Sequence, residues 1–105
     1  MPDVAFVRWD RLPGRTRPKK YIPVPPDLAL EVRSPSDEPG EIVKKLELYR
    51  RAGVPLVWWV NPATRTVDVY RNGQLVATLG EGDVLDGEDI LPGFRLPVDE
   101  IFAEA

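Results

Sequence analysis

The central segment of the chain, residues 26–53, has the sequence PDLALEVRSPSDEPGEIVKKLELYRRAG. Apolar side chains occur at every second position in its first part, namely at Leu28, Leu30 and Val32. A period of two is typical of a β-strand with one apolar face. We therefore predict a strand over residues 27–33, in which Glu31 and Arg33 project side by side from the other face.

The second part of this segment has the period of a helix. On a helical wheel, one wide apolar arc contains Ile42, Val43, Leu46, Leu48, Tyr49 and Ala52. The pattern predicts a helix over about residues 40–52. Ser36 or Asp37 is the expected N-cap, and Gly53 is expected just after the helix ends.

Lys45 is the unusual residue of this helix because it falls inside the apolar arc, whereas Lys44 lies on the solvated side. A lysine in an apolar arc either extends its ammonium to water or meets a buried negative charge. If the helix packs on the face of the strand that carries Glu31, Lys45 can approach that carboxylate. Such a pair is either structural or functional, and Tyr49 is expected to be a core residue with a solvated hydroxyl.

Composition limits the chemistry that this chain can perform. The 105 residues predict a single domain over residues 1–105, with 43% hydrophobic and 30% charged residues. The sequence contains no Cys and no His, so a thiol nucleophile, an imidazole base, a thiolate zinc site and a His-ligated metal are excluded. Carboxylates remain, and they suit oxygen-preferring ions such as Mg²⁺ or Mn²⁺.

Charge and hydropathy give further expectations about location and partners. The formal net charge of -3 argues against a broadly basic surface for nucleic acid. No apolar run approaches the roughly 20 residues that a membrane span needs, and the N-terminus lacks a signal-peptide pattern. We therefore expect a cytoplasmic protein without a membrane partner.

The N-terminal part of the chain contains a short strand candidate at Val4–Arg8, followed by a loop over residues 10–26. Asp3 precedes the strand and is either an ordinary terminal aspartate or part of a site. The loop is rich in cations, including Arg15, Arg17, Lys19 and Lys20. Such a loop either contacts phosphates or is a solvated connection.

The C-terminal half reads mainly as strands. Residues 55–60, PLVWWV, are uniformly apolar and predict a strand that is covered on both faces, with both tryptophans in or beside the core. Asn72-Gly73 predicts a type I′ turn between strands at residues 66–70 and 74–79. Residues 80–89 are acidic and are expected to form solvated turns. A short extended piece at 91–96 and a helical turn at 98–104, docking through Ile101 and Phe102, complete the chain.

Four segments of this chain resemble the Uma2 family, also called DUF820, of restriction endonuclease-like proteins. They are PDVAFV at residues 2–7, PDLALEVRSPSD at 26–37, KLELYRRAGVPLVWWVNP at 45–62 and LPGFRLPVDEIF at 91–102. The family belongs to the PD-(D/E)xK nuclease superfamily. The resemblance implies an α/β fold with a mixed sheet, one principal helix and a C-terminal hairpin or meander.

The resemblance also implies roles for individual residues in the hydrolysis of DNA phosphodiester bonds. Asp3 and Glu31 match the metal-binding acids, which would hold Mg²⁺ or Mn²⁺. Lys45 matches a lysine that in this family lies on the helix. Arg33 occupies the usual lysine position of the E-x-K triplet and is a candidate phosphate contact.

Compared with the family pattern, the chain begins at the PD strand, without an upstream helix that carries a further acidic residue. We therefore consider two alternatives. The chain is either a nuclease, with DNA as its partner, or an inactive nuclease fold that acts in binding or assembly. An uncovered sheet edge near the N-terminus would favour a homodimer.

Overall fold

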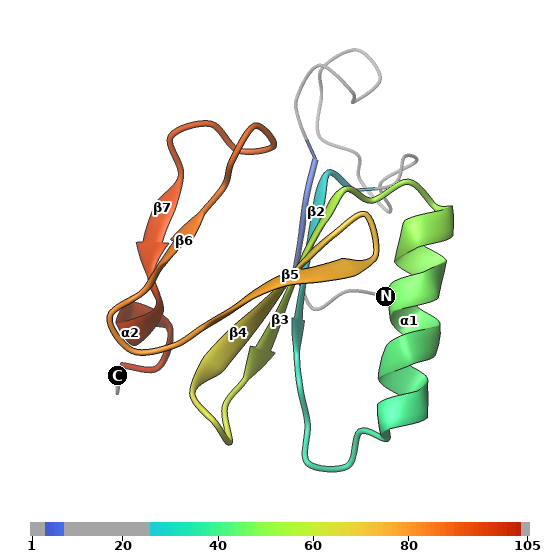
Figure 1. The fold of residues 1–105 in the computed structure, drawn as a ribbon, viewed down its shortest axis with the longest axis horizontal. Helices are drawn as coiled ribbons and strands as arrows, with labels where there is room; N and C mark the ends of the chain where they lie inside the picture. Colours follow the sequence, from blue (N-terminus) through green and yellow to red (C-terminus); the bar gives the residue numbers. More distant parts are fainter. Residues whose placement is uncertain (1–3, 8–25, 104–105) are drawn as a thin grey trace, which may run out of the picture.

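The computed structural model describes residues 4–7 and 26–103 of the chain. Its main feature is a five-stranded sheet in the order β1-β2-β3-β4-β5 (Figure 1). The strands are β1 (Val4–Phe6), β2 (Leu28–Val32), β3 (Leu56–Asn61), β4 (Thr66–Arg71) and β5 (Gln74–Leu79). Strands β2 and β3 are parallel, and every other neighbouring pair is antiparallel. The sheet is therefore mixed, as predicted.

The sheet lies between two outer layers (Figure 1). Helix α1 (Pro39–Arg51), which connects the parallel strands β2 and β3, covers one face. The other face is covered by a small sheet of β6 (Val84–Asp86) and β7 (Arg95–Pro97), followed by α2 (Val98–Ile101). The prediction of one principal helix on a mixed sheet is thus confirmed.

Two apolar clusters hold these layers together. The cluster on the β6–β7 side is built around eight buried residues: Leu28, Leu56, Trp58, Val60, Val67, Val69, Leu85 and Val98. The cluster under α1 is smaller and contains the buried residues Ala29, Val54, Val57 and Trp59. Because consecutive residues of a strand face opposite ways, Trp58 and Trp59 serve different clusters. Both are buried, so the prediction of core tryptophans is confirmed.

Helix α1 begins one residue earlier than predicted, and its N-cap was predicted wrongly. The N-cap is Glu38, whose side chain makes no capping hydrogen bond. Asp37 instead accepts a hydrogen bond from the Ser34 backbone N–H at 2.9 Å, which closes the preceding turn. The predicted role of Gly53 is confirmed, since it adopts a positive φ of 81° directly after the helix.

The apolar arc predicted for the helix was too wide. Ile42, Leu46 and Tyr49 pack on the sheet, but Val43 and Leu48 are 66% and 64% exposed. A helix that lies on a flat sheet buries a stripe of roughly 100°, and these two residues lie on its flanks. The inward stripe therefore includes Lys45, which is part-buried, and excludes Val43 and Leu48; Ala52, the C-cap residue, is also exposed.

The hairpin between β4 and β5 has the predicted turn, with positive φ values of 51° at Asn72 and 82° at Gly73. Gly73 is also required for packing. A Cβ atom at this position would lie 2.8 Å from the Cδ atom of Arg50 in the last turn of α1. The absence of a side chain at Gly73 thus allows the hairpin tip and the helix end to approach each other.

The C-terminal region contains one strand that was not predicted. Residues 84–86 were expected to form solvated turns, but they pair with β7, and Leu85 is fully buried. Val84 and Leu85 are adjacent and stand among acidic neighbours, so they give no alternation that would indicate a strand. The predicted helical turn is present as α2, and Ile101 and Phe102 pack on the main cluster. No helix in the described part of the chain is long and apolar enough to cross a membrane.

We expect Leu28→Ala to lower the free energy of unfolding by about 2–5 kcal/mol, because it empties a site that is fully buried. The matched control is Leu48→Ala, which makes the same chemical change at an exposed position of α1 and should alter stability by less than about 0.5 kcal/mol. Urea denaturation measures both values. Equal losses would contradict the outward placement of Leu48.

Candidate functional site

Glu31 is the central residue of the candidate site. It lies near the carboxyl end of β2, and its Cα atom is paired with that of Trp59 on β3. Its side chain faces α1 and is only 3% exposed. A carboxylate at this depth requires charged or hydrogen-bonding partners, because burial of an unpaired charge costs several kcal/mol.

Lys45 provides the compensating charge. Its Nζ atom lies 2.6 Å from Glu31 Oε2, and its side chain is 36% exposed. The ammonium thus reaches the carboxylate from the middle of α1 while it keeps some contact with solvent. The structure brings these two predicted site residues together, and their catalytic roles stay predictions.

Tyr49 is a site residue that the sequence analysis missed. Its hydroxyl donates a hydrogen bond of 2.8 Å to Glu31 Oε2, the same oxygen that Lys45 contacts. We had expected this hydroxyl to be solvated. The available signal was its spacing, since Tyr49 follows Lys45 by four residues and therefore lies on the same side of the helix.

Arg33 lies just beyond the end of β2, where its backbone N–H donates to Val60 O at 2.7 Å. It follows Glu31 by two residues, the spacing that puts two side chains on the same face of a strand. A cleft of about 470 Å³ opens here at the carboxyl ends of β2 and β3. Its lining residues are Arg33, Ser34, Pro35, Asn61, Pro62 and Ala63.

Arg33 lies close enough to Tyr70 to influence the charge of its hydroxyl. The pKa of Tyr70 is raised, first by burial and then by the nearby carboxylate of Asp68, and the guanidinium of Arg33 opposes that rise. Tyr70 packs in the cluster under α1. Arg33 therefore acts electrostatically on the face of the sheet that carries Glu31.

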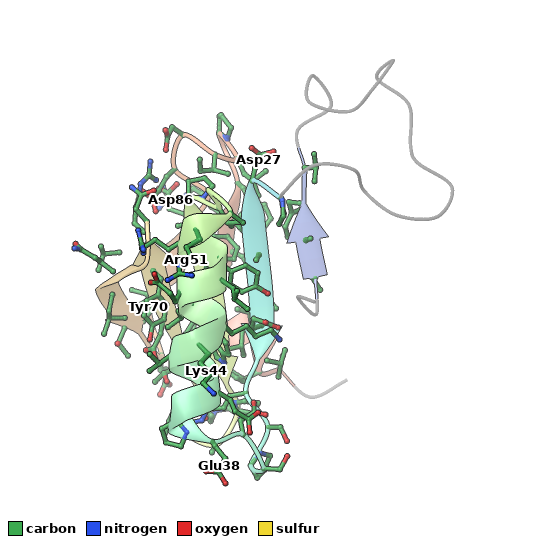
Figure 2. The ribbon with its side chains drawn as sticks, turned by 90° about the vertical axis from the view of Figure 1, so that its right-hand side faces the viewer. Asp27, Glu38, Lys44, Arg51, Tyr70 and Asp86 are labelled. Carbon is green, nitrogen blue, oxygen red and sulfur yellow. The ribbon has the colours of Figure 1, made fainter. Side chains whose placement is uncertain are left out.

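A second ion pair on α1 contrasts with the site. Glu47 accepts hydrogen bonds from Arg50 and Arg51 at the surface of the helix, and the Arg50 contact is the main reason that its pKa falls to about 2. Because this group is exposed, water and salt screen its interactions. Lys44 and Arg51 project from the side of α1 that faces away from the sheet (Figure 2). These residues serve as controls for the buried pair.

The remaining predicted site residues lie outside the described part of the chain. They are Asp3, Arg15, Arg17, Lys19 and Lys20. Within residues 4–7 and 26–103, no group of three or more His, Cys, Asp or Glu side chains could hold a metal ion. The described acid at the site is Glu31.

Comparison with known proteins agrees with this architecture. A family model, Uma2, described as "Putative restriction endonuclease", matches residues 1–99. The chain belongs to the Uma2 family. The resemblance seen in its four sequence segments is thereby confirmed. No curated protein matches the chain.

A solved structure shares the fold of this Uma2 chain. It is a crystal structure from Anabaena variabilis ATCC 29413, described as "a putative nuclease belonging to DUF820". The TM-score is 0.80 and the sequence identity is 22%, over 96% of this chain and 58% of the other. The predicted restriction endonuclease-like fold is confirmed, and the chain spans 58% of the length of that protein.

We expect Lys45→Ala to lower the free energy of unfolding by about 1–2 kcal/mol, because it leaves the Glu31 carboxylate without its cation. The loss is smaller than for a fully buried pair since the ammonium is partly solvated. Lys44→Ala is the matched control and should change stability by less than about 0.5 kcal/mol. Equal unfolding midpoints for the two variants would contradict a stabilising Glu31–Lys45 pair.

Proposed function

We propose that this Uma2 protein is a metal-dependent endonuclease that hydrolyses phosphodiester bonds in DNA. The observation that carries the proposal is the buried Glu31 carboxylate, in contact with Lys45 on the helix that follows its strand. The descriptions of the family and of the solved relative both indicate a nuclease.

We assign the metal to Asp3 and Glu31. Val4, the residue after Asp3, is paired with Leu30, the residue before Glu31. Each acid is thus the sequence neighbour of one member of this β1–β2 pair. This relation supports a common site for Asp3 and Glu31. Mg²⁺ fits such residues because it is usually bound by one or two carboxylates together with water and substrate phosphate.

The metal ligands and Lys45 would have different roles in hydrolysis. A bound Mg²⁺ or Mn²⁺ lowers the pKa of a coordinated water and stabilises charge on the phosphate. Lys45 would place its ammonium beside the reacting phosphate, where it orients the attacking water and offsets the developing negative charge. The Glu31 carboxylate is buried, whereas Lys45 keeps partial contact with solvent, from which a substrate would approach.

Arg33 and the cleft at the ends of β2 and β3 are assigned to the DNA backbone. A guanidinium matches the geometry of a phosphate, and the cleft is large enough for part of one nucleotide. Arg15, Arg17, Lys19 and Lys20 are further proposed phosphate contacts. With a net charge of -3, we expect attraction for DNA to be confined to the parts of the surface that carry these cations. Homodimerisation stays a prediction.

To test catalysis, supercoiled plasmid and single-stranded DNA are incubated with the full chain in Mg²⁺ or Mn²⁺. We expect cleavage that a chelator stops and that Glu31→Gln reduces at least about a hundredfold, because changes to groups around a metal ligand already cost up to about that much. Glu47→Gln removes a carboxylate from the solvated side of α1 and should cleave normally. The absence of cleavage by the folded parent protein would reject the proposal and favour an inactive nuclease fold.

To test the phosphate contact, DNA binding is measured by fluorescence anisotropy at several salt concentrations. We expect Arg33→Ala to weaken binding to all sequences and to reduce the salt-dependence slope by about one. Arg95→Ala is the matched control, since Arg95 is exposed on β7 in the opposite layer. Identical slopes for the parent and Arg33→Ala would exclude Arg33 as a backbone contact.

A further inference from the structure

We propose that Lys45 is a displaceable counter-ion, which occupies Glu31 until a divalent cation replaces it, and that Tyr49 is the positioning residue that holds the carboxylate during this exchange. The inference rests on the proposed function, because it assigns metal binding to Glu31. It adds a competition between two cations for one buried carboxylate.

The contacts of Glu31 Oε2 are the first argument. This oxygen lies 2.6 Å from the Lys45 ammonium and accepts the Tyr49 hydroxyl at 2.8 Å. A cation that binds the Glu31 carboxylate is attracted by the same negative charge that holds the ammonium. Two positive charges within a few ångströms repel each other, and the repulsion is strong where little water screens it. Metal binding therefore weakens the ion pair between Glu31 and Lys45.

The two donors differ in their freedom to move. The Lys45 side chain is flexible and 36% exposed, so it can withdraw into solvent. The ring of Tyr49 packs against the buried cluster of Ala29, Val54, Val57 and Trp59, which restricts its motion. When the ammonium leaves, the hydroxyl of Tyr49 still fixes the direction of the carboxylate.

This exchange would connect metal binding to the placement of the proposed catalytic lysine. While Lys45 pairs with Glu31, its charge is neutralised and is not available to a phosphate. Displacement releases the Lys45 ammonium near Glu31. There it can pair with a phosphate of bound DNA. The protein would thus present both positive charges to DNA only after it has bound the metal ion.

The proposal predicts metal affinities that change in opposite directions. Lys45→Ala removes the competing cation and should tighten Mn²⁺ binding about tenfold, although it is expected to impair cleavage. Tyr49→Phe removes only the hydroxyl and should weaken Mn²⁺ binding about tenfold or more, as is typical of groups that orient a metal ligand. A purely structural role for either residue does not produce opposite changes.

Isothermal titration calorimetry with MnCl₂, without DNA, measures these affinities on the full chain. The matched controls are Lys44→Ala on the solvated side of α1 and Tyr70→Phe in the cluster under α1, and both should bind Mn²⁺ like the parent. If Lys45→Ala does not fold, Lys45→Gln removes the charge and keeps most of the side chain. The shift of the unfolding midpoint with Mn²⁺ provides a second readout, which should be larger for Lys45→Ala than for the parent.

Tighter binding by Lys45→Ala and weaker binding by Tyr49→Phe would support the proposal. Unchanged or weaker binding by Lys45→Ala, or no Mn²⁺ binding by any variant, would overturn the counter-ion role. Equal affinities for Tyr49→Phe and Tyr70→Phe would overturn the positioning role. If the opposite changes occur in a protein that does not cleave DNA, the competition stands and the proposed nuclease activity is rejected.

Discussion

The packing of α1 on the sheet depends on the compensation of the negative charge of Glu31, which is buried in the described part of the chain together with a second acid, Asp27. Glu31 is almost fully buried on the second strand of the sheet, and its carboxylate is stable there because α1 supplies an ammonium and a hydroxyl. These contacts constrain the rotation of the helix about its own axis, together with the packing of Ile42 and Leu46 on the sheet. The stripe that faces the sheet contains Lys45 and Tyr49, and Val43 and Leu48 lie in solvent. Electrostatic pairing, together with apolar burial, thus selects the face that the helix presents.

The sheet topology places the carboxylate on a well-supported strand. β2 has a hydrogen-bonded neighbour on each side, and both of its faces are covered by apolar clusters. A parallel connection from β2 to β3 requires a crossover, and α1 provides it on the Glu31 side of the sheet. The strand that carries the acid and the helix that carries the lysine are therefore consecutive in the chain. A short segment of sequence encodes the main parts of the candidate site, and the rest of the described chain holds that segment in place.

Much of this arrangement could be predicted from the sequence, because local periodicity and turn chemistry are strong in β2, α1, β3 and the Asn72-Gly73 hairpin. The position of Lys45 within an apolar arc also indicated its approach to Glu31. The hydrogen bond from the Tyr49 hydroxyl to Glu31 was not predicted. A sequence pattern indicates which side of the helix a residue faces, but it does not identify the hydrogen-bond partner of its polar atom. The Asp37 contact and β6 depend on pairing with residues that periodicity cannot identify. The roles of Asp3 and of the basic loop lie outside the described residues and stay predictions.

The tip of the β4–β5 hairpin contacts the end of α1, the helix that carries two residues of the candidate site. Gly73 lies against the side chain of Arg50, one residue after Tyr49 on the helix. The last turn of α1 and the β4–β5 turn are therefore in contact at a residue that has no side chain. A residue with a Cβ atom there would require the Arg50 side chain to shift, because that atom would lie 2.8 Å from Arg50 Cδ. The helix turn that carries Tyr49 is thus next to a β-turn where any side chain would displace Arg50.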